Sequence, residues 1–190
     1  NESHSVGIRY RPGFGLRSES SQEGKSVANI GGILDDETNT DAIVLTEPSP
    51  THEVNMYYNG RAGKLNIDFN ADFHDSRSKE LKTYNEISKY QDNRILNTSS
   101  NTHNRLYASK LTLTYPLFGG VLTAGSEYSN TMRYDEYIND EGYVPSAYTK
   151  IREYELSAYA EYIYPFRFGS LTAGIRYEHI GFNYYENDVL

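Results

Sequence analysis

The chain has 190 residues, with 26 acidic and 18 basic side chains and a formal net charge of −8. Nucleic-acid-binding domains usually carry a basic face, so this balance argues against a nucleic-acid partner. The absence of cysteine excludes a disulfide scaffold and a thiolate metal site, and no run of about 18 apolar residues predicts a membrane-spanning helix. Membrane-spanning β-strands are not excluded, because each needs only about ten alternating residues.

Alternation of apolar and polar residues predicts an all-β chain. In "KLNIDFNADF", Leu65, Ile67 and Phe69 fall on one face of a strand, and the intervening Asn and Asp residues fall on the other. We expect an antiparallel up-and-down meander of about seven or eight long strands. The predicted strands cover residues 4–16, 52–59, 64–75, 102–115, 121–134, 150–164 and 170–184, with further strand pieces near 27–33 and 42–46.

The predicted connections alternate in length. Short Gly-containing turns are expected at 59–64, 116–120 and 165–169. Long polar loops are expected at about 18–50, 76–101 and 134–148. Short turns on one side and long loops on the other are typical of an outer-membrane β-barrel. We therefore interpret residues 1–190 as a single β-barrel segment.

One hairpin sequence occurs twice. "YPLFGGVLTAGSEY" begins at Tyr115, and "YPFRFGSLTAGIRY" begins at Tyr164. A barrel wall repeats its hairpin because every strand crosses the same bilayer. Aromatic residues gather near the predicted short turns, as the interfacial girdle of such a barrel requires.

The alternation fits two environments. In a membrane barrel the apolar residues face lipid, and the polar residues face the lumen. The alternative is a stand-alone soluble or small membrane barrel of the lipocalin type that binds a small apolar ligand; in the soluble barrel the apolar residues would instead contact one another inside it. The expected lipid-facing residues are Leu65, Ile67, Phe69, Leu111, Leu113, Leu122, Leu171 and Ile175. The expected lumen-facing residues are Asp68, Asp72, Lys110, Glu127, Arg176 and Glu178, with Arg9, Arg105 and Glu161 as further candidates.

The stretches "HEVNMYYNGRAGKLNIDFNADF", "NRLYASKLTLTYPLFGGVLTAGSEYS", "DEGYVPS" and "FRFGSLTAGIRYEHIGFNYYEN" resemble the C-terminal barrel region of TonB-dependent receptor-like outer-membrane proteins, including the SusC-like proteins of Gram-negative bacteria. The resemblance implies a barrel of about 22 strands with an internal plug domain, energised through TonB and importing nutrients across the outer membrane. The chain lacks the terminal aromatic of such barrels, since it ends Asp188-Val189-Leu190. We therefore expect an internal barrel segment, whose apolar face meets outer-membrane lipid or, in isolation, curls into a small barrel or drives oligomerisation.

Few residues point to chemistry. The acidic stretch Leu34–Asp41 offers oxygen ligands for a cation but lacks the spacing of a calcium-binding loop, so we interpret it as a solvated loop. "YDEYINDEGY" over Tyr134–Tyr143 is interpreted in the same way, with a sugar or cation contact as the alternative. Glu127 and Arg176 occupy equivalent places in the two hairpins and are expected to pair or to line the lumen. We expect no catalysis, cofactor or metal, and a nutrient ligand at the long loops.

Overall fold

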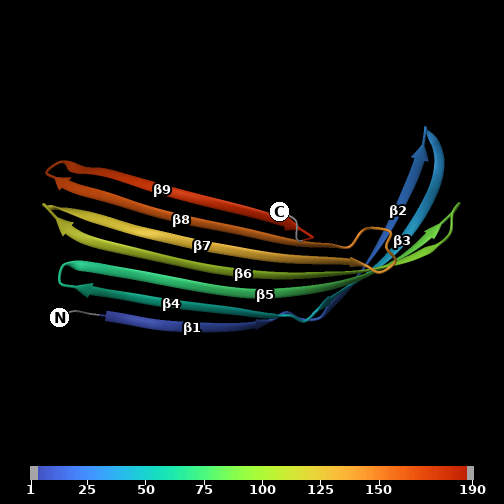
Figure 1. The fold of residues 1–190 in the computed structure, drawn as a ribbon, viewed down its shortest axis with the longest axis horizontal. Helices are drawn as coiled ribbons and strands as arrows, with labels where there is room; N and C mark the ends of the chain where they lie inside the picture. Colours follow the sequence, from blue (N-terminus) through green and yellow to red (C-terminus); the bar gives the residue numbers. More distant parts are fainter. Residues whose placement is uncertain (1–3, 188–190) are drawn as a thin grey trace.

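A computed structural model describes residues 4–187 as one open antiparallel sheet, drawn in Figure 1. The all-β prediction is confirmed. No described segment forms a helix that is long and apolar enough to cross a membrane. The strands are β1 (His4–Phe14), β2 (Ser18–Ile30), β3 (Ile33–Glu47), β4 (Pro50–Ala62), β5 (Leu65–Ser88), β6 (Arg94–Leu117), β7 (Gly120–Asn139), β8 (Ala147–Phe166) and β9 (Gly169–Glu186).

The first four strands are two long strands, each interrupted once. β1 pairs with β4 and β2 pairs with β3, so residues 4–30 and 33–62 form one long hairpin. Gly31 and Gly32 close it in the left-handed region of φ that glycine tolerates best. Pro48 and Ser49 interrupt the ladder directly before β4 begins at Pro50, and there the Gly15 N–H donates to the carbonyl oxygen of Ser49 at 2.9 Å. The sheet is therefore the expected meander of seven long strands. The β2–β3 hairpin bends away from the plane of the other labelled strands (Figure 1).

Most of the predicted loop residues belong to strands, so the prediction of long loops at 18–50 and 76–101 is wrong. β2 and β3 occupy the first range, and the ends of β5 and β6 occupy the second. In the third range, 134–148, only residues 140–146 connect β7 to β8. Antiparallel pairing satisfies the backbone groups of a strand that is wet on both faces, and such a strand shows no apolar alternation.

The sheet is not a small barrel. Its strand order is β1-β4-β5-β6-β7-β8-β9, and the edge strands β1 and β9 do not pair with each other. The prediction that the chain curls closed is therefore wrong for the described residues. The ladders from β5 to β9 contain no register shift, whereas tight closure needs bulges or glycine bends that increase the coil of the sheet.

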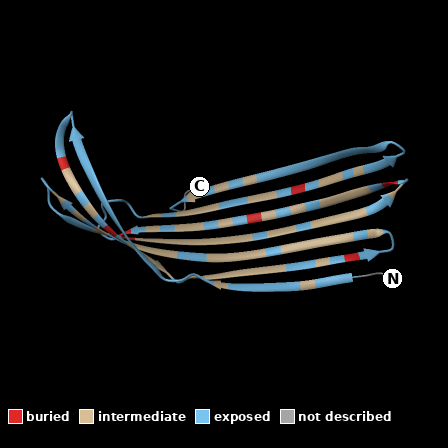
Figure 2. Ribbon diagram, turned by 180° about the vertical axis from the view of Figure 1, so that it is seen from behind, coloured by how far each residue is buried: buried red, intermediate tan, exposed pale blue. Residues whose placement is uncertain are grey.

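The described part of the chain has almost no interior. Ala42 is the single described apolar residue that is buried, and Figure 2 shows exposed or half-buried strands nearly throughout. Leu171 and Ile175 are 65% and 77% exposed. An apolar surface of this extent is unfavourable in water and marks a face that another phase or partner covers. The ends Asn1–Ser3 and Asp188–Leu190 lie outside the described residues.

Candidate functional site

The strand register places all eight expected apolar residues on one face of the sheet. Directly opposed residues in an antiparallel ladder point to the same side. Ile67 lies opposite Leu113, which lies opposite Ala124 on β7. Ala124 continues the row through Ala160 on β8 to Ile175 on β9. We call this side the apolar face; it contains Leu65, Ile67, Phe69, Leu111, Leu113, Leu122, Leu171 and Ile175, together with Val6, Ile8, Val54 and Met56.

The apolar residues form a band with aromatic borders. On β5 the band runs from Leu65 to Phe73, and on β6 it runs from Tyr107 to Tyr115. At about 3.3 Å per residue and a tilt near 40°, that length gives a band roughly 20 Å tall. The Phe73 and Tyr107 rings meet at its far border, with centroids 5.1 Å apart. The height of roughly 20 Å is a little less than the band of about 25 Å that outer-membrane barrels present to lipid.

The opposite side, which we call the polar face, carries a charge ladder across four strands. Glu127 on β7 accepts from Lys110 Nζ at 2.7 Å and from the Arg176 guanidinium at 3.0 Å. Arg176 on β9 also pairs with Glu178. Its guanidinium reaches Glu127 across β8, where it lies 5.8 Å from the centre of the Tyr159 ring. The pairing of Glu127 with Arg176, which the sequence left open, is therefore present.

Replacing Glu127 with glutamine should lower the free energy of unfolding by about 1 kcal/mol, because it removes the anion shared by two cations and leaves them facing each other. Solvent screens the pairs, so a larger loss is not expected. Urea titration of the folded protein in lipid vesicles measures the change. Glu155→Gln is the matched control, since Glu155 lies on the polar face and forms no ion pair within the described residues. Equal losses in both variants would contradict the ladder.

The remaining polar candidates form a second, separate group. Asp68 accepts from the side-chain amides of Asn59 at 2.8 Å and Asn70 at 3.0 Å, and Asp72 accepts from Asn55 at 2.7 Å. The structure does not bring this group into contact with Glu127. Arg9 and Glu161 also lie on the polar face, as expected.

The placement of Arg105 on the polar face is wrong. Its partner Asp75 lies on the same side as Phe73, so Arg105 belongs to the apolar face just beyond the band. Arg105 is out of phase with Lys110 on the same strand, so its charge is not a guide to its face. Leu106, the next residue, takes the polar side instead.

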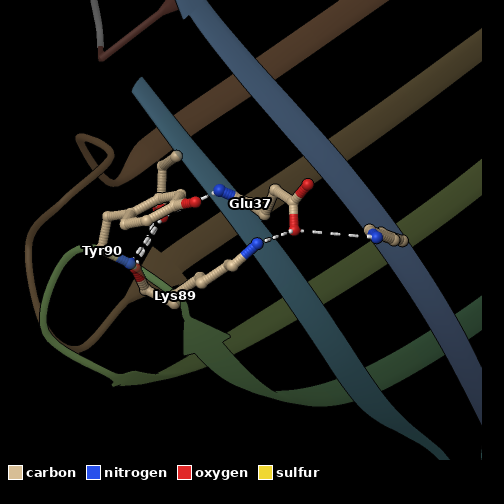
Figure 3. A network of polar contacts seen from close by, with 6 residues as sticks. Glu37, Lys89 and Tyr90 are labelled. Atoms are coloured by element: carbon tan, nitrogen blue, oxygen red, sulfur yellow. Dashed lines mark hydrogen bonds and ion pairs between the residues drawn. The ribbon is translucent and has the colours of Figure 1, made fainter. Parts of the chain in front are cut away.

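A group of polar contacts, which we call the clasp, joins the β2–β3 hairpin to the β5–β6 hairpin. Both hairpins lie at the same end of the sheet, opposite the short turns, and we call this the long-strand end. Asp36 on β3 is only 8% exposed and accepts hydrogen bonds from the hydroxyl of Ser88 at 2.8 Å and the N–H of Tyr90 at 3.2 Å. The neighbouring Glu37 accepts from Lys89 Nζ at 3.0 Å (Figure 3). Burial alone would raise the pKa of Asp36, but its hydrogen bonds, led by that from Ser88, outweigh burial and lower it.

The clasp should loosen in acid. Because the pKa of Asp36 is lowered on folding, its stabilising contribution is present above the unfolded value of about 3.9 and is lost as pH falls through the folded value. A fluorescent label on Asp92→Cys should report loosening only below about pH 4. In Asp36→Asn the same label should report a loose connection at every pH. An unchanged acid transition in that variant would contradict the role of Asp36.

The clasp uses the candidate cation ligand Asp36 of the acidic stretch Leu34–Asp41. Protein donors already occupy both carboxylate oxygens of Asp36. Between His4 and Asn187, no group of three or more His, Asp or Glu side chains is arranged to hold a metal ion. The side chains of the stretch Tyr134–Tyr143 likewise have different partners. The Tyr134 ring lies tilted against that of His103, whereas Glu141 accepts hydrogen bonds from the backbone and side chain of Asn97.

One match to a known protein family agrees with this architecture. The family described as "TonB dependent receptor-like, beta-barrel" matches residues 4–189. No curated relative matches the chain. Among solved structures, the ferric citrate transporter FecA in its unliganded form is 13% identical, with a TM-score of 0.37; the match covers 80% of this chain and 31% of that one.

Two further structures match with lower scores. The outer-membrane protein AlkL is 11% identical with a TM-score of 0.14, covering 93% of this chain and 89% of that one. OccK10 of Pseudomonas aeruginosa is 9% identical with a TM-score of 0.13, covering 98% and 92%. The family match over nearly the whole chain carries the assignment: the chain belongs to the TonB-dependent receptor-like β-barrel family.

Proposed function

We propose that this chain forms part of the wall of an outer-membrane receptor that imports a nutrient, with its apolar face against lipid. The observation that carries the proposal is the single apolar face itself. It crosses all seven long strands in register, is bordered by aromatic rings, and has no second layer over it within the described residues. Lipid is the phase that such a band fits.

A stand-alone barrel with an apolar interior is the less supported alternative. It would need β1 and β9 to pair and Leu111 to face Ile175 across a closed core. The sheet is open at both edges instead. Unpaired backbone groups within a bilayer cost several kcal/mol each, so the proposed wall is completed by further strands beside β1 and β9. Without them, the exposed apolar face would drive self-association.

The polar face then lines the lumen. Its charged ladder and amide–carboxylate pairs are suited to a wet interior that holds a plug domain, and the partner energising import is TonB, as in the family. The long-strand end, with the β2–β3 hairpin and the β5–β6 connection, would meet the nutrient outside the cell. The role proposed for the chain is non-catalytic.

Uptake tests the nutrient assignment. A strain lacking the protein is compared with its parent for accumulation of labelled glycans, vitamins and metal chelates. We expect accumulation of one compound class to fall, and to fall equally in the parent when the proton-motive force is collapsed. Equal accumulation of every compound by the two strains would contradict import.

A further inference from the structure

Two cross-strand rows of side chains lie on the apolar face directly beyond the aromatic border. They run across β5 to β9 at the long-strand end, and neighbouring strands are about 4.8 Å apart. The first row is Asp75, Arg105, Met132, Arg152 and Asn183, and the second is Arg77, His103, Tyr134, Lys150 and Tyr185. We call the four permanently charged cations Arg77, Arg105, Lys150 and Arg152 the cationic belt.

The belt is basic in an acidic chain. It sets four cations against the single carboxylate of Asp75, although the chain as a whole carries a net charge of −8. Asp75 pairs with Arg105 at 2.8 Å and with His103 at 2.7 Å. Arg77 and Arg152 are exposed and form no ion pair within residues 4–187. At least two guanidinium groups are therefore free to meet an external anion.

The same height of the polar face has the opposite character. There, Arg133 is neutralised by Asp135 at 2.6 Å, and Glu186 adds a further negative charge. The positive charge is thus confined to the side that carries the apolar band. Solubility of the strand ends alone would not require the two faces to differ in charge at this height.

Aromatic rings and a groove accompany the cations. Lys150 Nζ lies 5.5 Å from the centre of the Tyr134 ring and 5.7 Å from that of Tyr185. A groove of about 520 Å³ opens beside Tyr134, and its lining includes Arg77 and His103 together with the carboxylates of Glu47 and Glu136. Lys79 also lines it and is paired with Glu47 at 3.0 Å, so Arg77 is its unpaired cation within residues 4–187. Arg77, which belongs to both the groove and the belt, places an unpaired guanidinium directly beyond the apolar band.

We infer that the cationic belt binds the phosphate-bearing headgroup of an outer-leaflet lipid whose acyl chains lie on the apolar band. Guanidinium groups suit phosphate because they donate two parallel hydrogen bonds, and amphipathic tyrosine rings favour the headgroup level. Each basic side chain near a membrane surface adds to the attraction for anionic lipid. The inference rests on the proposed function, since it requires the apolar face to meet lipid.

Lipid binding to the intact receptor tests the inference. Native mass spectrometry compares retention of bisphosphorylated lipid A with that of its dephosphorylated form, both from neutral detergent. We expect phosphate-dependent retention that falls about tenfold or more in the Arg77→Gln, Lys150→Gln, Arg152→Gln triple variant. The matched control is Arg61→Gln, Lys64→Gln, Arg167→Gln, which removes the same charge at the short-turn end and should retain lipid as the parent does. Millimolar inorganic phosphate should not displace the lipid, because the headgroup binds as part of an anchored molecule.

Equal retention of both lipids, unchanged retention by the triple variant, or an equal loss in the control would overturn the inference. Displacement by free phosphate would assign the belt to a soluble anion instead and would also overturn it. Heat-modifiable migration on gels verifies that each variant is folded. Lipid exposure of Leu111, measured separately, distinguishes failure of this inference from failure of the proposed function.

Discussion

Leu111→Arg should lose about 2–4 kcal/mol of folding free energy in lipid vesicles, one of the two largest effects expected for a single substitution. Leu111 lies at the middle of the apolar band on β6, four residues from both Tyr107 and Tyr115. A guanidinium at that depth must leave water without an anionic partner. Urea-dependent unfolding of the vesicle-inserted protein measures the loss.

Thr114→Arg provides the matched control. Thr114 lies on the same strand but on the polar face, opposite Asn66 and Thr123. An arginine there faces the wet side and should change the free energy of unfolding by less than about 0.5 kcal/mol. If the two arginines cost the same, the two faces do not meet different phases.

Gly125→Ala should destabilise the wall by about 1–3 kcal/mol because the site has no room for a methyl group. The Tyr159 ring crosses the bare backbone of Gly125 and its hydroxyl lies 3.1 Å from Thr112 Oγ1. A Cβ on residue 125 would lie 2.6 Å both from the Leu111 carbonyl oxygen and from the Tyr159 ring. The same unfolding titration in vesicles measures the effect.

Substitutions of two other glycines, Gly174 and Gly24, serve as controls for Gly125→Ala. Gly174 is the equivalent of Gly125 in the repeated hairpin, but an added Cβ would meet its nearest neighbour at 3.2 Å, so Gly174→Ala should cost less. Gly24 on β2 has nothing within 4 Å, and Gly24→Ala should be nearly neutral. Equal effects at Gly125 and Gly24 would show that loss of backbone freedom, rather than the Tyr159 contact, sets the cost.

The apolar face was predictable because alternation is a local signal. Leu65, Ile67 and Phe69 reveal their common side without knowledge of any partner strand. The same signal fails at the long-strand end, where the residues of β2 are exposed throughout and follow no apolar period. Those strands exist because backbone pairing continues beyond the band, which composition does not reveal.

The polar contacts were only partly predictable, because they depend on register. The repeat singled out Glu127 and Arg176 as equivalent residues, yet their contact requires Arg176 to reach across an entire strand. The acidic stretch around Asp36 was visible in the sequence, but its partner Ser88 was not, since the pairing of β3 with β5 brings Ser88 to it. Long-range pairing of this kind follows from the sheet, not from neighbouring residues.

The central claim is that the apolar face meets lipid and the polar face meets water. The chain contains no cysteine, so single cysteines introduced at Lys110, Leu111, Thr112 and Leu113 place a spin label at one defined site each. The measurement is the collision of each label with oxygen, which dissolves in lipid, and with a water-soluble nickel chelate, in the receptor reconstituted in vesicles. We predict strict alternation, with oxygen dominant at 111 and 113 and nickel dominant at 110 and 112. Labels that all meet nickel, or that are all shielded from both reagents, would contradict a membrane wall and favour an apolar face buried against protein.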